Sequence, residues 1–206
     1  MSHPDEPTPM SAPESSPAPG YVLELRQKFT VIQNRYDLVR VDQGTAVPLA
    51  YAEQKRFSLK EKVTFWSGTD KREVAFTIAA RNVIELVGTY DVRGPADELL
   101  GTIRKDAKTS LLRSTYRVEV PGGAIVTGQE RGQLKAVLRR VVGVASDFPW
   151  PFPIHFDFLG PDGRPVLAVE RQMRLRDVYH VPVTDGRLDW RVAAAVAVAV
   201  DAFMNR

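Results

Sequence analysis

The sequence predicts a mainly β domain whose antiparallel strands form a sandwich or a barrel around a hydrophobic C-terminal helix. Three observations predict this fold. About twelve short segments of alternating or β-branched residues follow one another from Tyr21 onward. Turn signals such as Gly94-Pro95 separate several of them. Near the C-terminus, residues 192–200 read VAAAVAVAV, an apolar run that has no polar face at helical spacing.

The expected strands have apolar residues at every second position or form short runs rich in β-branched side chains. We expect strands at residues 29–33, 36–41, 49–53, 63–66, 73–79, 86–91, 99–104, 115–120, 124–129, 154–159, 166–171 and 177–183. Gly, Pro or Asp-Gly signals between them are typical of antiparallel sheets. The sequence has no repeat of fixed period.

Two segments depart from this strand pattern. Residues 133–142 place Leu and Val side chains at helical spacing, with basic residues between them, and predict an amphipathic helix. The second segment is the C-terminal helix. Thr184 or Asp185 is expected to cap its start, and Asp189 lies where the helix dipole favours a negative charge.

The C-terminal run must be enclosed by the rest of the chain, because a helix that is apolar all round leaves no face for water. At about 1.5 Å per residue it is about 14 Å long, roughly half the hydrocarbon core of a bilayer. A barrel of about eleven or more strands can enclose a helix, and Ala and Val side chains are small enough to fit its lumen. The alternatives are a helix packed between two sheets or at a dimer interface.

The bulk composition is typical of one globular domain with an N-terminal tail. Of the 206 residues, 44% are hydrophobic and 26% are charged, which fits a water-soluble fold. Residues 1–20 are rich in Pro and Ser and are expected to be a disordered tail, which leaves residues 21–206 for the domain. The absence of cysteine excludes disulfides and thiol chemistry. No signal peptide is recognisable, so a cytoplasmic location is expected.

Three stretches and the C-terminal helix together resemble one known family. The stretches are QKRFSLKEKVTFW at residues 54–66, GTYDVRGPADELLGTIRKDAKTSLLRSTYRVEV at residues 88–120 and HFDFLGPDGRPVLAVERQ at residues 155–172. With the closing DWRVAAAVAVAVDAFMNR they resemble the tubby C-terminal-like superfamily, in particular its LURP-one-related and phospholipid-scramblase branches. The resemblance implies a closed barrel of twelve antiparallel strands around a C-terminal helix.

No enzymatic motif is present in the sequence. It contains no G-x-S-x-G, P-loop, H-E-x-x-H or strand-linked G-x-G-x-x-G pattern. We therefore expect a protein that is not an enzyme, with no catalytic residue and no cofactor. Scramblase relatives have an acidic segment before the last helix that is thought to bind calcium. The matching stretch here has only Asp185 and Asp189, and Ca²⁺ prefers six to eight oxygen ligands, so no metal site is expected.

Clustered basic residues are the best candidates for a binding site, because Lys and Arg near a membrane attract anionic headgroups at about 1 kcal/mol each. Tubby-like proteins bind phosphoinositides, and the resemblance puts Arg104 and Lys105 near such a contact. The alternative is an ordinary charged strand edge that prevents aggregation. The candidate headgroup-binding residues are Lys60, Lys62, Arg104, Lys105, Lys108 and Arg113.

Two further segments have alternative interpretations. The basic face of residues 133–142 can lie in a membrane interface or cover an end of the barrel. The aromatic and proline-rich residues 148–158 can insert into a membrane or bind a partner if exposed, but Phe156 and Phe158 alternate as one buried face of a strand.

The leading functional hypothesis is a non-enzymatic module that binds anionic phospholipid headgroups, peripheral at the inner face of the membrane. The competing hypothesis is a soluble scaffold that binds another protein or a small apolar ligand, without a membrane role. A net charge of +3 is modest and disfavours nucleic-acid binding. The sequence does not indicate an oligomeric state.

Overall fold

The computed structural model describes residues 18–29, 33–55, 62–81, 88–106, 115–122, 125–130, 154–172 and 178–204. These ranges contain twelve strands and one helix, α2 (Trp190–Met204). The strands are β1 (Tyr21–Phe29), β2 (Gln33–Asp42), β3 (Thr45–Lys55), β4 (Val63–Trp66), β5 (Val74–Ala80), β6 (Thr89–Arg93), β7 (Leu99–Asp106), β8 (Thr115–Glu119), β9 (Ile125–Glu130), β10 (Ile154–Leu159), β11 (Pro165–Gln172) and β12 (Val178–Val183).

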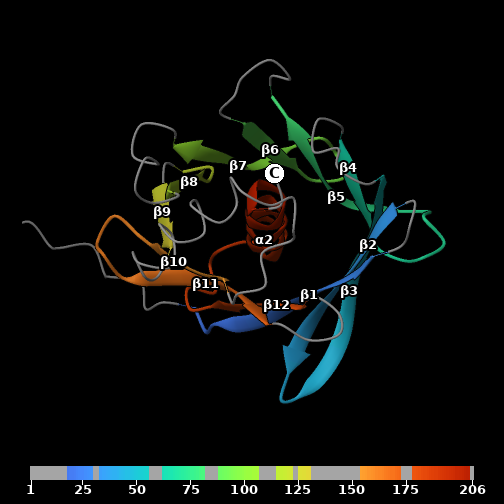
Figure 1. Cartoon of the computed structure of the whole chain (residues 1–206), viewed down its shortest axis with the longest axis horizontal. Helices are drawn as coiled ribbons and strands as arrows, with labels where there is room; N and C mark the ends of the chain where they lie inside the picture. Colours follow the sequence, from blue (N-terminus) through green and yellow to red (C-terminus); the bar gives the residue numbers. More distant parts are fainter. Residues whose placement is uncertain are drawn as a thin grey trace, which may run out of the picture.

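The strands form a closed antiparallel barrel, which confirms the predicted fold class. Each strand pairs with its neighbours in the chain, and β1 pairs with β12 to close the ring (Figure 1). Both β1 and α2 begin at one end of this ring, and α2 ends at the other. We call the first end the base of the barrel and the second the far end.

Helix α2 lies along the barrel axis and fills the lumen (Figure 1). All nine residues from Val192 to Val200 are at most 1% exposed, so the apolar run is enclosed as the sequence predicts. Strand β7 comes close to the helix at Gly101, where an added Cβ would lie 3.3 Å from the methyl groups of Val192. A side chain there would push the helix away from the wall.

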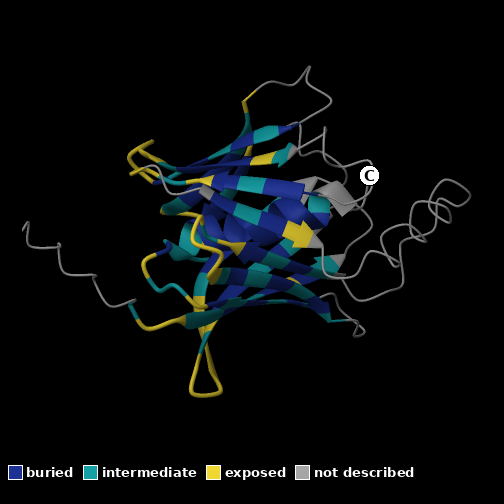
Figure 2. Ribbon diagram, turned by 90° about the vertical axis from the view of Figure 1, so that its left-hand side faces the viewer, coloured by how far each residue is buried: buried dark blue, intermediate teal, exposed yellow. Residues whose placement is uncertain are grey.

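Large side chains of the wall surround the small side chains of the helix. Phe65 and Phe76 stack at 4.4 Å between ring centroids, and Tyr116 meets Phe156 edge-on at 5.1 Å. Burial follows the alternation of each strand, for example in β12, and Figure 2 shows buried residues alternating with more exposed ones along the wall. The predicted inward face of Phe156 and Phe158 is confirmed, because both are 0% exposed.

The cap of α2 differs from the prediction. The helix begins at Trp190, and the Asp189 carboxylate accepts a hydrogen bond of 2.8 Å from the backbone N–H of Arg191. Asp189 is therefore the N-cap, a position in which aspartate satisfies an otherwise free helical N–H. Thr184 and Asp185 lie before a short turn, in which the Leu188 N–H donates to the Asp185 carbonyl. They are too far from the helix to cap it.

The prediction did not include the first strand, and the strand expected at residues 29–33 lies mostly outside the described residues, with Phe29 at the end of β1 and Gln33 at the start of β2. The structure places β1 at Tyr21–Phe29, where Leu23 and Leu25 face the lumen. Gln27 is also buried on this inward face. Because it is polar, it interrupts the apolar alternation by which the sequence would have identified the strand. The predicted helix at residues 133–142 lies outside the described residues, as does the expected tail except for residues 18–20.

Candidate functional site

Three of the six predicted headgroup-binding residues can be placed in the fold. Lys62 immediately precedes β4 and is exposed, while Arg104 and Lys105 lie near the end of β7. All three are therefore at the far end of the barrel wall. Lys60, Lys108 and Arg113 lie outside the described residues.

Arg104 and Lys105 belong to opposite faces of the wall. Arg104 is exposed on the outside, and within the described chain it makes no ion pair. Lys105 is half-buried and shares the face of Ile103, which is 0% exposed in the lumen. Neighbouring residues of a strand point in opposite directions, so these two cations do not converge on one anion.

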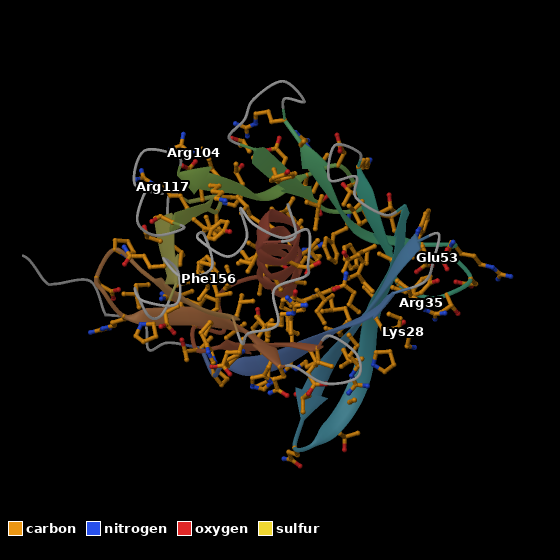
Figure 3. All side chains as sticks on the ribbon, in the orientation of Figure 1. Lys28, Arg35, Glu53, Arg104, Arg117 and Phe156 are labelled. Atoms are coloured by element: carbon orange, nitrogen blue, oxygen red, sulfur yellow. The ribbon has the colours of Figure 1, made fainter. Side chains whose placement is uncertain are left out.

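A residue that the sequence analysis missed, Arg117, completes the outer surface around Arg104. The two arginines are directly paired across β7 and β8, and both lie on the outer side of the wall (Figure 3). Side chains in such pairs have Cβ atoms about 4.5–5.5 Å apart, which is close enough for both guanidinium groups to reach one ligand. Turn chemistry alone could have suggested a β7–β8 hairpin, but the sequence does not reveal its register.

Threonines flank the two arginines in the same row. Thr89 pairs with Arg104 from β6, and Thr127 pairs with Arg117 from β9. Both threonines are half-buried on the outward face. Guanidinium groups and hydroxyls are all donors, and Arg matches phosphate oxygens bidentately. We call the row formed by Thr89, Arg104, Arg117 and Thr127 the arginine row.

Lys62 is too far away to share one small anion with the arginine row. It precedes β4, and three strand spacings separate β4 from β7 in the barrel. At about 4.8 Å per spacing, the two positions are roughly 14 Å apart around the wall. Lys62 and Arg104 can therefore contact different headgroups of one membrane surface.

A second charged group, on the outside of β1, β2 and β3 and joined by Lys71 from the β4–β5 connection, is held together by ion pairs. The Lys28 ammonium lies 2.9 Å from the Asp37 carboxylate, and the Lys71 ammonium lies 2.6 Å from the Glu53 carboxylate. The Arg35 guanidinium lies 4.5 Å from the Tyr51 ring centroid (Figure 3 labels Lys28, Arg35 and Glu53). These contacts cover Tyr51, which is only 6% exposed, so the group stabilises the wall.

The pKa values of this second group follow its hydrogen bonds. Burial, together with the hydrogen bond to Glu53, raises the pKa of Tyr51 to about 12. The hydrogen bond from Lys71, followed by that from Tyr51, lowers the pKa of the Glu53 carboxyl. Tyr51 is neutral and Glu53 is ionised near neutral pH, which leaves neither group poised for proton transfer.

A polar cluster inside the far end of the barrel fixes the end of α2. The Tyr179 hydroxyl donates to the carboxylate of Asp201, which is 2% exposed, and the Tyr36 hydroxyl lies 3.4 Å from the same carboxylate. The Gln27 side-chain amide donates to the Tyr36 hydroxyl at 3.3 Å. These groups join the helix to the adjacent strands β12, β1 and β2.

The two aspartates before α2 are engaged by arginines. Asp185 binds Arg187 at 2.7 Å and Asp189 binds Arg191 at 2.6 Å. Burial acts to raise the pKa of Asp189, but hydrogen bonds from the Arg191 side chain and backbone outweigh it, and the pKa is lowered. Carboxylates held in this way are poor calcium ligands. In the described ranges, no group of three or more His, Asp or Glu side chains has metal-binding geometry.

The base of the barrel carries an excess of acidic residues. Seven acidic residues lie in the described base connections, at residues 43–44, 67–73, 94–98, 120–122, 160–164 and 184–189, against four basic ones. The acidic residues are Asp70, Glu73, Asp97, Glu98, Asp162, Asp185 and Asp189, and the basic ones are Lys71, Arg72, Arg164 and Arg187. Arg93 and Arg191 lie just outside these connections and pair with Asp97 and Asp189, so they offset part of this excess.

No protein-family model matches the chain, and no curated protein matches it. Within the ranges that the structure describes, no helix combines the length and the hydropathy needed to cross a bilayer.

Proposed function

We propose that this protein is a non-enzymatic barrel module that binds anionic phospholipid headgroups and thereby associates peripherally with a membrane surface. The arginine row carries the proposal. Two guanidinium groups placed side by side present several donors to one phosphate group, and such charge-assisted hydrogen bonds are among the strong ones. The sequence resemblance to tubby-like and scramblase-related proteins supports the same function.

The proposed contact uses the outer wall at the far end of the barrel. Arg104 and Arg117 bind the phosphate oxygens, and the hydroxyls of Thr89 and Thr127 add donors on either side. Lys62 adds long-range attraction from the same end. Each basic residue near the surface contributes about 1 kcal/mol, so several contacts are needed for stable association.

Vesicle co-sedimentation of the full chain tests this proposal. The variant R104E/R117E should bind anionic phosphatidylserine vesicles at least about tenfold more weakly, since about 2 kcal/mol of attraction is lost and repulsion is added. Binding of the parent should weaken as salt is added. Vesicles of phosphatidylcholine alone should not bind.

The matched control is R72E/R164E. Arg72 and Arg164 have side chains that are 84% and 79% exposed at the base of the barrel. The control changes the net charge by the same amount as R104E/R117E, so it separates the arginine row from overall charge. Equal loss in the two double variants, or no binding by the parent, would refute the proposal.

A further inference from the structure

The barrel wall is weakest between β3 and β4. In the described parts of these strands, only Tyr51 and Trp66 are paired. Toward the base, residues 45–50 of β3 keep their partners on β2 but have none on the β4 side within the described chain. This stretch of β3 is therefore a free sheet edge, with backbone groups available for another strand.

Irregularities on both sides end the pairing at this level. A bulge between Leu38 and Val39 bends the β2–β3 ribbon, and another between Phe65 and Trp66 bends the β4–β5 pair. After Trp66 the chain turns back on itself, because the Ser67 N–H donates to the Glu73 carbonyl at 2.9 Å. Bulges of this kind terminate pairing at barrel rims and beside functional sites.

A hollow lies on each side of the free edge. The inner hollow has a volume of about 590 Å³ and the outer one about 520 Å³. Ser67 lines both, so they meet where β4 stops. The inner hollow is mainly apolar, although Glu73 and Arg191 also line it; its apolar residues are Leu49, Val74, Ala75, Pro95 and Trp190. The outer hollow is lined by Arg26, Lys28, Asp37, Pro48 and Tyr51, among other residues.

We propose that this free edge binds an extended segment of a partner protein by β-strand addition. An added strand would take the place into which β4 does not continue. Its side chains would point alternately to the two sides of the sheet, and therefore alternately into the inner and outer hollows. This geometry gives backbone hydrogen bonds for affinity and two different hollows for sequence preference.

The two hollows define the chemistry of the segment. The inner hollow selects a large apolar side chain beside Trp190. In the outer hollow Lys28 is paired with Asp37 at 2.9 Å and Arg26 with Glu24 at 2.8 Å, so this hollow favours an uncharged polar side chain. The preferred partner segment therefore alternates apolar and uncharged polar residues.

The edge is less suited to a second copy of this chain. Six residues at about 3.4 Å each span only about 20 Å. Two edges of this length, paired side by side, bury far less than the roughly 800 Å² per partner of a standard interface. Pro48 also removes one backbone donor from the edge. Pairing of two identical edges would include that defect twice, whereas a partner strand meets it once.

The test uses the full chain and a blocked heptapeptide of alternating valine and threonine. Binding should shift the amide NMR signals of Ala46, Val47, Leu49 and Thr69. The same peptide N-methylated at alternate amides should bind at least about tenfold more weakly, since it cannot complete the backbone hydrogen bonds. Absence of these shifts at about 1 mM peptide, equivalent to about −4 kcal/mol, would overturn the proposal.

Two matched variants locate the site. Ser67→Trp places a bulky ring where the hollows meet and should weaken peptide binding at least about tenfold by filling them. Leu159→Trp introduces the same ring at a 40% exposed position on β10 and should leave binding within about twofold. Equal effects of the two variants would overturn the assignment. A dimer of the parent that Ser67→Trp dissociates would also do so, in favour of self-association.

Discussion

In the described chain, the residues of α2 that face the lumen are mostly Ala and Val. Asp201 is the one charged residue among them. Its carboxylate accepts hydrogen bonds from Tyr179 and Tyr36, which lie on different strands. The small Ala and Val side chains of this helix interlock weakly with the wall, so they do not by themselves determine how far the helix lies along the barrel axis. Because these hydroxyls are directional, Asp201 determines how far α2 enters and which face meets β12 and β2.

Replacement of Asp201 should therefore destabilise the fold strongly. Each hydrogen bond to a charged group contributes about 1.5–3 kcal/mol, so Asp201→Ala should lower the free energy of unfolding by about 3 kcal/mol. Asp201→Asn keeps one acceptor and should lie between Asp201→Ala and the parent. Urea denaturation measures both. A loss below about 0.5 kcal/mol for Asp201→Ala would show that the cluster does not anchor the helix.

The N-cap residue Asp189 should make stability depend on acid pH. Its pKa is lowered in the folded state, so its stabilising effect is present above the unfolded pKa of about 3.9 and is lost as the pH falls through the folded pKa. Asparagine caps helices nearly as well but cannot pair with Arg191. The parent should be about 1 kcal/mol more stable than Asp189→Asn at pH 7. Denaturation curves should show this gap closing below pH 4, and a gap that stays constant would contradict the ion-pair origin.

At the scale of elements, most of the strands were predictable because half-buried strands alternate in their sequence. β1 was not, because Gln27 occupies an inward position and the apolar residues that follow Phe29 look more like a strand.

The candidate site was predictable only in part. Arg104 stands out in the sequence, but its partner Arg117 depends on the β7–β8 register, and the polar groups around Asp201 come from four separate elements.

The enclosed helix predicts a large difference between two equivalent substitutions. Ala197 is 0% exposed in the lumen, whereas Ala46 is exposed on β3. Ala197→Asp buries a carboxylate without a partner of opposite charge. It should lower the free energy of unfolding by at least about 4 kcal/mol, equivalent to about 10 °C in melting temperature. Ala46→Asp should melt within about 2 °C of the parent. Thermal unfolding followed by circular dichroism measures both, and similar melting of the two variants would contradict the enclosure of α2.

At the scale of the whole molecule, the described charges are distributed unevenly along the barrel, and one contact closes the ring. The base is acidic in its described connections, while Lys62 and Arg104 lie toward the far end without ion pairs in the described chain. This asymmetry gives the module a direction in which to approach an anionic surface. The ring itself depends on β1 and β12, which are distant in sequence and close the barrel around the helix.

The β1–β12 contact offers a direct test of closure, because the chain contains no cysteine. Glu24 and His180 are paired across these strands and are half-buried on the outer face. A disulfide between Glu24→Cys and His180→Cys would tie together ends separated by most of the chain. Such a link restricts the unfolded state and should add about 4 kcal/mol to the free energy of unfolding. Chemical denaturation of the oxidised and reduced double variant measures the gain, with Glu24→Cys alone as the control. Failure to form the bond, or equal stability of the two redox forms, would show that β1 and β12 do not hold the barrel closed.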